Sequence, residues 1–165
     1  MGLEVIDDFL HPEEFKKIES RLYSTDIAWY YNPNAVTTDP KTISQFTHTF
    51  FDIRRNGQVS DFFHLFTPCL HKLRAVTLYR LKANLNLKTF FHRPTGYHID
   101  IPHPDLKTSV FYINTNNGFT QFKRGGKIRS IANRMVIFDS EMEHQGVTCT
   151  DEKNRVVVNF NYGHH

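Results

Sequence analysis

Cysteine is scarce in this sequence: the two residues present, Cys69 and Cys149, lie far apart and form no C-x-x-C pair. Their scarcity excludes a scaffold held together by disulfides and a zinc site built on paired cysteines. Two isolated cysteines are typical of a protein from a reducing compartment. We therefore expect a cytoplasmic location, with both thiols buried.

Long apolar runs, internal repeats and blocks of like charge are also missing. No apolar stretch approaches the length needed to cross a bilayer, and the acidic N-terminal residues do not resemble a secretory leader, so neither an anchor nor a signal peptide is expected. The net charge of +3 comes from scattered Lys and Arg. This pattern permits an acidic partner and argues against a nucleic acid, because no basic groove is evident.

Aromatic residues, in contrast, are plentiful and make up 14% of the 165 residues. That content indicates a packed interior, and the length suits one domain but not two. Within this single domain, residues 1–75 predict a cap of helices and mixed structure. Residues 76–163 predict a β core. The sequence makes no prediction about oligomeric state.

Two helices are expected in the cap. Apolar side chains recur at i, i+3 and i+7 from Phe15 to Leu22, which predicts a helix that begins at Pro12. Ser60 is a suitable cap for a second helix, which Pro68 should kink or split. The apolar face of the first helix is expected to lie on the β core.

The most informative residues are His98 and Asp100, two positions apart. On an extended strand, residues i and i+2 point to the same face, so one metal ion can contact both. A second pair of this kind, His103 and Asp105, follows at once. Because Pro104 lacks a backbone donor and favours a loop there, we prefer the first pair. The alternative is a histidine at a strand end that bonds a nearby carboxylate.

A second imidazole, His144, lies far along the chain. If it joins His98 and Asp100, a metal ion there has two imidazoles and one carboxylate on one side, with the remaining positions open. This is the donor set of non-haem Fe(II) oxygenases. Open positions matter because oxygen and a cosubstrate must both reach the iron. His164 and His165 at the C-terminal end are left out of this site.

Residues 155–162 are rich in β-branched and aromatic side chains, which predicts a strand. One of its faces is fully apolar and predicts packing. The other face consists of Arg155, Val157, Asn159 and Asn161. Such a polar face suits the lining of a cavity, where a guanidinium can bind a carboxylate through two parallel hydrogen bonds. The alternative for Arg155 is a salt bridge in solvent.

Strict alternation predicts another strand at residues 79–87, with leucines on one face. The opposite face carries Arg80, Lys82, Asn84 and Asn86. This face is either solvated or, in a barrel-like sheet, it supplies amides from Asn84 and Asn86 to a cosubstrate or substrate. The loop at 32–41 is a candidate for the mouth of such a pocket, and the loop at 88–96 for a lid.

From about residue 79 to residue 162 the sequence resembles the 2-oxoglutarate- and Fe(II)-dependent dioxygenases, specifically their prolyl-4-hydroxylase-like branch. The run 109–114, Ser-Val-Phe-Tyr-Ile-Asn, looks like that family's Tyr-Leu-Asn strand. The features that carry the resemblance are, in order, His98 and Asp100, the run 109–114, the run 118–122, His144 and Arg155. Their order and spacing together are far more specific than any one of them.

The resemblance implies a mainly β fold: a distorted double-stranded β-helix, or jelly-roll, of two facing sheets with N-terminal helices packed on one sheet. It implies that Fe(II) is held by His98, Asp100 and His144. Arg155 would bind the distal carboxylate of 2-oxoglutarate, and the hydroxyl of Tyr112 would reach the same carboxylate. The four amides of Asn84, Asn86, Asn159 and Asn161 are candidates for lining the same pocket.

The implied reaction hydroxylates a C–H bond, consumes O2 and 2-oxoglutarate, and releases succinate and CO2, with ascorbate as an optional reductant. Two departures weaken the transfer of a prolyl substrate: residues 116–118 are Asn-Asn-Gly where relatives often carry Trp and Gly-Gly, and Arg155 stands where collagen prolyl hydroxylases carry Lys. The leading hypothesis is hydroxylation of a peptide or protein. The same chemistry on a small molecule or nucleic-acid base is second, and a non-catalytic β-sandwich binding protein is third.

Overall fold

The computed structural model describes residues 2–36, 39 and 41–164; Thr37, Thr38 and Pro40 of the polar loop, and His165, lie outside the described residues. In chain order the elements are β1 (Glu4–Ile6), α1 (Pro12–Leu22), β2 (Tyr30–Asn32), β3 (Gln45–Asp52), the 3-10 turn η1 (Ile53–Arg55), β4 (Gly57–Gln58), the 3-10 helix η2 (Asp61–Phe66), α2 (Thr67–Lys72), β5 (Ala75–Leu87), β6 (Leu106–Tyr112), β7 (Phe119–Phe122), β8 (Gly126–Arg129), β9 (Arg134–Asp139), β10 (His144–Val147) and β11 (Asn154–His164).

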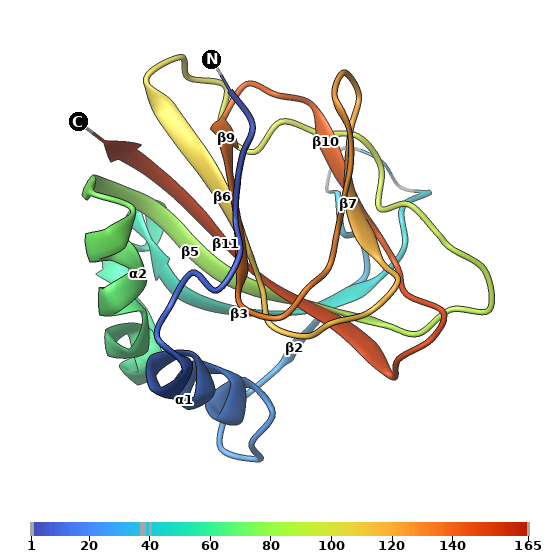
Figure 1. Ribbon diagram of the computed structural model, residues 1–165, viewed down its shortest axis with the longest axis horizontal. Helices are drawn as coiled ribbons and strands as arrows, with labels where there is room; N and C mark the ends of the chain where they lie inside the picture. Colours follow the sequence, from blue (N-terminus) through green and yellow to red (C-terminus); the bar gives the residue numbers. More distant parts are fainter. Residues whose placement is uncertain (1, 37–38, 40, 165) are drawn as a thin grey trace.

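Two antiparallel sheets form the body of the protein (Figure 1). The larger sheet has the order β1-β9-β6-β11-β5-β3-β2, with β4 paired to β3, and the smaller has the order β10-β7-β8. The longest strands, β5 and β11, pair at the centre of the larger sheet. This arrangement confirms the predicted double-stranded β-helix.

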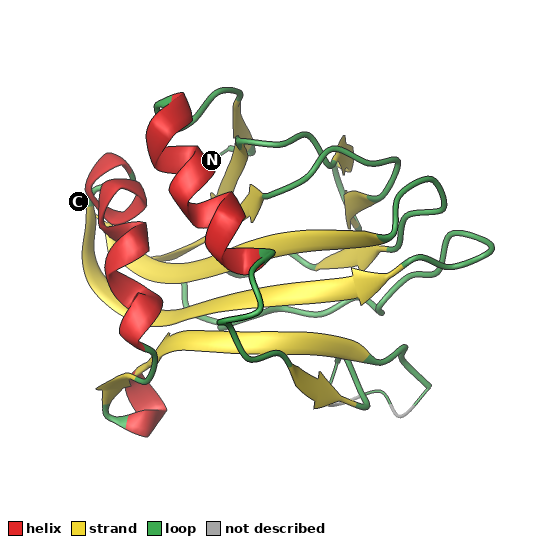
Figure 2. Cartoon of the chain, turned by 90° about the horizontal axis from the view of Figure 1, so that it is seen from below, coloured by secondary structure: helices red, strands yellow, loops and turns green. Residues whose placement is uncertain are grey.

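Both helices lie across one face of the larger sheet (Figure 2). The start of α1 is favoured by Pro12 in its first turn and by His11, whose Nδ1 accepts a hydrogen bond from the Glu13 amide. Ser60 caps η2 as expected, and α2 begins directly after it with Pro68 in its first turn. The predicted split of the second helix is therefore confirmed.

The N-terminal part contributes strands as well as helices. The short strand β1 pairs with β9, and β2 and β3 extend the larger sheet beyond β5. Within the described chain no helix has the length and apolar character needed to span a membrane. Cys69 and Cys149 are both buried and unpaired, as expected from their isolation in the sequence. The division of the domain into cap and core at residue 75 stays a prediction.

Strand β11 separates the apolar core from a polar interior. Val156, Val158 and Phe160 pack into the cluster between sheet and helices. The alternate side chains, Arg155 and Asn159 among them, face the space between the two sheets. The predicted division of this strand into a packing face and a cavity face is confirmed.

The expectation of a strand at His98 to Asp100 was wrong. The segment is a loop with one isolated bridge, in which the backbone amides of His98 and His144 each donate to the other's carbonyl over 3.0 and 3.1 Å. Gly96, at a φ of +99°, turns the chain just before it. Pro102 and Pro104, just after it, have no backbone donors to extend a ladder.

Candidate metal centre

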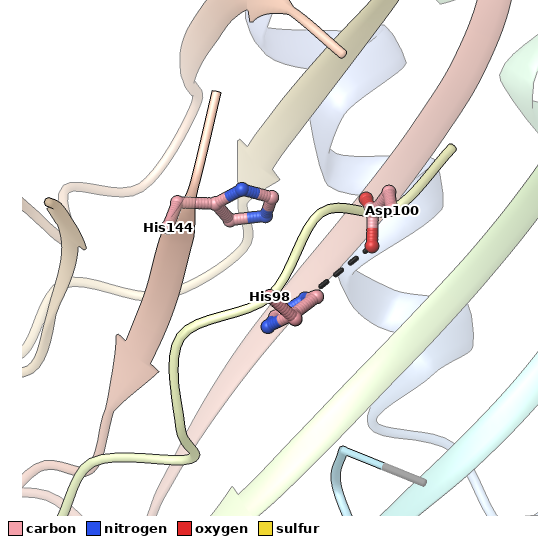
Figure 3. Close-up of side chains that lie close together, drawn as sticks. All are labelled: His98, Asp100 and His144. Atoms are coloured by element: carbon pink, nitrogen blue, oxygen red, sulfur yellow. Dashed lines mark ion pairs between the residues drawn. The ribbon is translucent and has the colours of Figure 1, made fainter. Parts of the chain in front are cut away.

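Three side chains that are distant in sequence converge between the sheets. His98 and Asp100 come from the loop before β6, and His144 is the first residue of β10 (Figure 3). One potential ligand atom from each lies within 4.8 Å of the other two. The backbone bridge between His98 and His144 brings their rings to 4.7 Å between centroids. The predicted triad is thus assembled, by a loop and a strand and not by two strands.

Hydrogen bonds orient both imidazoles with Nε2 toward the centre of the triad. The Nδ1 atom of His98 lies 3.1 Å from the Gly96 carbonyl, and that of His144 lies 2.9 Å from the Met142 carbonyl. A carbonyl only accepts, so each Nδ1 carries a proton and each Nε2 is the ring atom left to bind a metal ion. The Nε2 of His144 is buried without a hydrogen-bond partner among the described residues. An unpaired, buried acceptor of this kind suits a metal ligand.

The electrostatics of the two imidazoles differ. Burial lowers the pKa of His144, which keeps the ring neutral and available as a donor. Burial acts in the same direction on His98, but the hydrogen bond and charge of Asp100 outweigh it and raise the pKa of His98. A divalent ion bound at His98 Nε2 would displace the proton that this raised pKa favours.

Asp100 is held in its ionised form. Its side chain is 4% exposed, and its Oδ1 atom lies 3.4 Å from His98 Nε2 and 3.2 Å from Arg80 Nη2. Its Oδ2 atom accepts a hydrogen bond from Asn161 Nδ2 over 3.1 Å. Burial opposes ionisation, but the contact with His98 and the nearby positive charges hold the pKa of Asp100 well below its usual value.

The competing His-x-Asp pair does not take part. The side chains of His103 and Asp105 are 52% and 88% exposed, and their closest charged atoms are 4.0 Å apart. His164 lies at the end of β11, and His165 lies outside the described residues. The preference for His98 and Asp100 over the second pair therefore agrees with the geometry.

A cavity of about 220 Å³ opens beside the triad. The larger sheet contributes most of its polar wall, and Asn32 and Val36 of the polar loop border it, as expected for the mouth. Among the predicted residues, those on its wall are Asn84, Asn86, His98, Asp100, His144, Arg155 and Asn159. The loop at 88–96 reaches it through Thr95, while Phe90 at its tip is 89% exposed. Its role as a lid stays a prediction.

Arg155 is the largest fully buried side chain among the described residues, 2% exposed. Its Nε donates to Ser130 Oγ over 2.9 Å and its Nη2 to Thr120 Oγ1 over 3.1 Å. In the described part of the chain it forms no ion pair with a carboxylate, and burial lowers its pKa. The guanidinium is therefore a buried cation whose counter-ion the protein does not supply, and the surface alternative is excluded.

Tyr112 and Asn161 lie behind this wall. The Tyr112 hydroxyl donates to Thr120 Oγ1 over 2.7 Å, and the Arg155 guanidinium lies 5.6 Å from its ring centre. The Asn161 amide bonds Asp100 and Thr108 instead of facing the cavity. The predicted contacts of these two residues with the cosubstrate stay predictions.

Sequence reasoning missed several participants. Thr120 and Ser130 orient Arg155, and Arg80 neutralises Asp100. Two of them left a signal: Arg80 shares the polar face of its strand with Asn84 and Asn86, and Thr120 lies in the run 118–122. Ser130 comes from a segment with no motif of its own.

No protein-family model matches the sequence, and the curated proteins include no relative detectable by sequence. Solved structures do resemble the fold. An oxidoreductase of the 2OG-Fe(II) oxygenase family from Burkholderia pseudomallei superposes with a TM-score of 0.69 at 11% identity, over 99% of this chain and 86% of that one. A prolyl hydroxylase from Trichoplax adhaerens, in complex with a peptide fragment of the hypoxia inducible factor oxygen degradation domain, gives 0.63 at 16% identity, over 98% and 84%.

HygX from Streptomyces hygroscopicus, with nickel, 2-oxoglutarate and hygromycin B bound, gives a TM-score of 0.62 at 12% identity, over 99% of this chain and 83% of that one. These identities are too low to transfer a substrate or a reaction. They do show that the chain has, over nearly its whole length, the fold found in 2OG-Fe(II) oxygenases, prolyl hydroxylases among them.

Proposed function

We propose that the protein is an Fe(II)- and 2-oxoglutarate-dependent dioxygenase that hydroxylates a C–H bond. One observation supports this proposal above all: the buried Arg155 guanidinium lines the same small cavity as the triad of His98, Asp100 and His144. Among the described residues, no carboxylate forms an ion pair with this guanidinium. The triad suits the ferrous ion, and the guanidinium suits a carboxylate of 2-oxoglutarate.

The triad fits a ferrous ion. His98 and His144 would donate from their Nε2 atoms, and Asp100 would supply the charged ligand. When bound, the iron supplies the oxidative chemistry, with O2 and 2-oxoglutarate as cosubstrates and ascorbate as an optional reductant. The protein's own task is to orient both rings, to keep His144 neutral through burial, and to hold Asp100 ionised beside Arg80.

Arg155 fits the distal carboxylate of 2-oxoglutarate. Its Nε and Nη2 atoms are turned toward Ser130 and Thr120, which fixes the plane of the guanidinium. Gly118 packs directly against its side chain, since a Cβ there would lie 2.7 Å from Arg155 Cδ. A rigid, desolvated cation of this kind binds a carboxylate with little loss of side-chain entropy.

Two classes of substrate remain as candidates for this reaction. The sequence favours a peptide or protein hydroxylated in the manner of prolyl-4-hydroxylases, with a small molecule as the second candidate. The cavity wall is strongly polar on the side of Asp100, where Arg80, Lys82 and Asn159 gather. That polarity favours the small molecule.

The direct test is cosubstrate turnover. Purified protein is incubated with Fe(II), ascorbate and 2-oxoglutarate, and succinate is measured with and without candidate substrates. We expect slow uncoupled succinate formation that disappears in Asp100→Ala and persists in Asp105→Ala, a matched change in the exposed His-x-Asp pair. A protein that binds the metal but forms no succinate under any condition would support the non-catalytic alternative.

A further inference from the structure

Lys82 stands on the cavity wall without a partner. It lies in the middle of β5, on the face that turns toward the smaller sheet, and its side chain is partly buried. Burial lowers its pKa to about 8, so the ammonium stays mainly protonated at neutral pH. No hydrogen bond or ion pair joins this ammonium to any described residue.

The carboxylates that act on Lys82 are already engaged. Asp100 contacts Arg80 and Asn161 and belongs to the metal triad. Asp52 accepts two hydrogen bonds from the Arg54 side chain, over 2.8 and 3.1 Å. The chain therefore places a lysine in its reaction cavity and leaves it without a counter-ion.

Unpaired amides surround this lysine. Asn159 lies opposite Lys82 on β11, and Asn84 follows two positions along β5 on the same face. The Oδ1 atoms of both asparagines are buried and lack a hydrogen-bond partner in the described structure. Buried amide oxygens are rarely left unpaired, so the cavity presents two free acceptors, Asn84 Oδ1 and Asn159 Oδ1, beside one cationic donor, the Lys82 ammonium.

Lys82 and Arg155 belong to different parts of the cavity. Arg155 is level with Asn86, whereas Lys82 is level with Asn159, four residues further along β11. Four residues of extended strand span about 13 Å. Lys82 therefore lies on the side of Asp100, away from the proposed anchor of the cosubstrate.

The net charge of the cavity also favours an anionic substrate. Among the described residues on its wall, Arg80, Lys82 and Arg155 are cationic and Asp100 is the carboxylate. A divalent ion and a dicarboxylate cosubstrate would bring equal and opposite charges. An excess of two positive charges therefore remains when both are bound, and it attracts an anion.

We infer that the substrate is a small molecule whose carboxylate binds the Lys82 ammonium while its C–H bond faces the metal centre. A hydroxyl or amino group of the same molecule would donate to the unpaired Oδ1 atoms of Asn84 and Asn159. This inference rests on the proposed function. A neutral pyrrolidine ring at the same place would strip water from the ammonium without replacing it, which is strongly unfavourable. The three side chains thus select against a peptidyl proline.

The test measures binding by calorimetry, with Mn(II) in place of iron. The metal-loaded protein is first titrated with 2-oxoglutarate. With that site saturated, it is titrated with propionate, butyrate and hexanoate, each beside its neutral carboxamide. We expect saturable binding of at least one carboxylate and at least roughly tenfold weaker binding of its amide, the loss of one charge-assisted hydrogen bond.

Lys82→Met retains the length of the side chain and removes its charge. It should weaken the carboxylate at least roughly tenfold and leave the dissociation constant of 2-oxoglutarate unchanged. Lys88→Met, in the exposed segment after β5, is the matched control and should change neither. A melting temperature no lower than that of the wild type shows that Lys82→Met is folded, since the change removes a buried charge.

Each other outcome is decisive. If no carboxylate is distinguished from its amide, the anion site does not exist. If Lys82→Met weakens 2-oxoglutarate as much as the carboxylates, Lys82 belongs to the cosubstrate site instead. If the wild-type protein binds no 2-oxoglutarate at all, the proposed function itself fails, and this inference fails with it.

Discussion

Asn161 donates a hydrogen bond to Asp100 over 3.1 Å, although 61 residues separate the two. The side-chain oxygen of Asn161, Oδ1, accepts a hydrogen bond from Arg80 Nε. The Nη2 atom of Arg80 in turn contacts Oδ1 of Asp100, the oxygen that Asn161 does not bond. Asp100 is therefore fixed by two side chains of the larger sheet before any metal arrives. The same strand, β11, carries Arg155 toward its other end, so one strand orients both the His98–Asp100–His144 triad and the buried guanidinium.

Replacement of Asn161 by leucine should weaken metal binding. Partners that orient a metal ligand are typically worth about tenfold to a hundredfold in metal affinity, so we expect a loss of that size for Mn(II) or Ni(II), measured by calorimetry. Asn159, two positions earlier on the same face, forms no hydrogen bond with Asp100, so Asn159→Leu should leave metal affinity unchanged. Equal effects of the two substitutions would show that Asn161 does not act through Asp100.

Gly118→Ala should disturb the proposed binding site of 2-oxoglutarate at Arg155. A Cβ at this position would lie 2.7 Å from Arg155 Cδ and 2.8 Å from the Val147 carbonyl oxygen, so Arg155 or the backbone must shift. We expect a destabilisation of about 1–3 kcal/mol in denaturant unfolding and a raised 2-oxoglutarate requirement. Gly163→Ala, where a Cβ meets its neighbours at an ordinary 3.7 Å, should be nearly silent. Unchanged cosubstrate affinity in Gly118→Ala would contradict the tight packing around Arg155.

Arg155→Ala should separate cosubstrate binding from metal binding. The loss of a buried, charge-assisted bidentate contact is worth a few kcal/mol, or on the order of a hundredfold in 2-oxoglutarate affinity. Metal affinity should stay within a factor of about two, because Arg155 contacts none of the three ligands. Arg124→Ala, in the exposed turn before β8, serves as the control. Normal 2-oxoglutarate affinity in Arg155→Ala would assign the guanidinium a purely structural role.

Much of the fold and the triad could be predicted from sequence, because both depend on patterns that are local or ordered along the chain. Period-two alternation divides β11 correctly into a packing face and a cavity face, since side-chain direction in a strand follows from backbone geometry alone. The order of His98, Asp100, His144 and Arg155 led to the family resemblance, which the fold now supports.

The remainder depends on which segments meet in space. Within the part of the chain that the structure describes, the His98 segment bridges His144 alone, so it forms one bridge instead of a ladder. From the sequence, a solvated face and a cavity-lining face are equally good interpretations for the side of β5 that carries Lys82. Only the position of the smaller sheet, built from residues far along the chain, decides that it lines a cavity.

Metal binding should also stabilise the fold. The apo site holds a buried, unpaired His144 Nε2 and a largely desolvated Asp100, and a divalent ion satisfies both. At a hundred times its dissociation constant, an ion that binds only the native state adds about 2.7 kcal/mol. For a chain of this size we expect a rise in melting temperature of roughly 5–10 °C with Ni(II), reversed by a chelator. An unchanged melting temperature at saturating metal would contradict a site formed in the native state.

The most direct measurement is the stoichiometry of metal binding to the wild-type protein, Asp100→Ala and Asp105→Ala, by calorimetry under anaerobic conditions with Fe(II). We predict one ion per wild-type chain, one per Asp105→Ala chain, and none retained by Asp100→Ala, because the one charged ligand is gone. Full binding by Asp100→Ala, or its loss in Asp105→Ala instead, would contradict a metal centre at His98, Asp100 and His144.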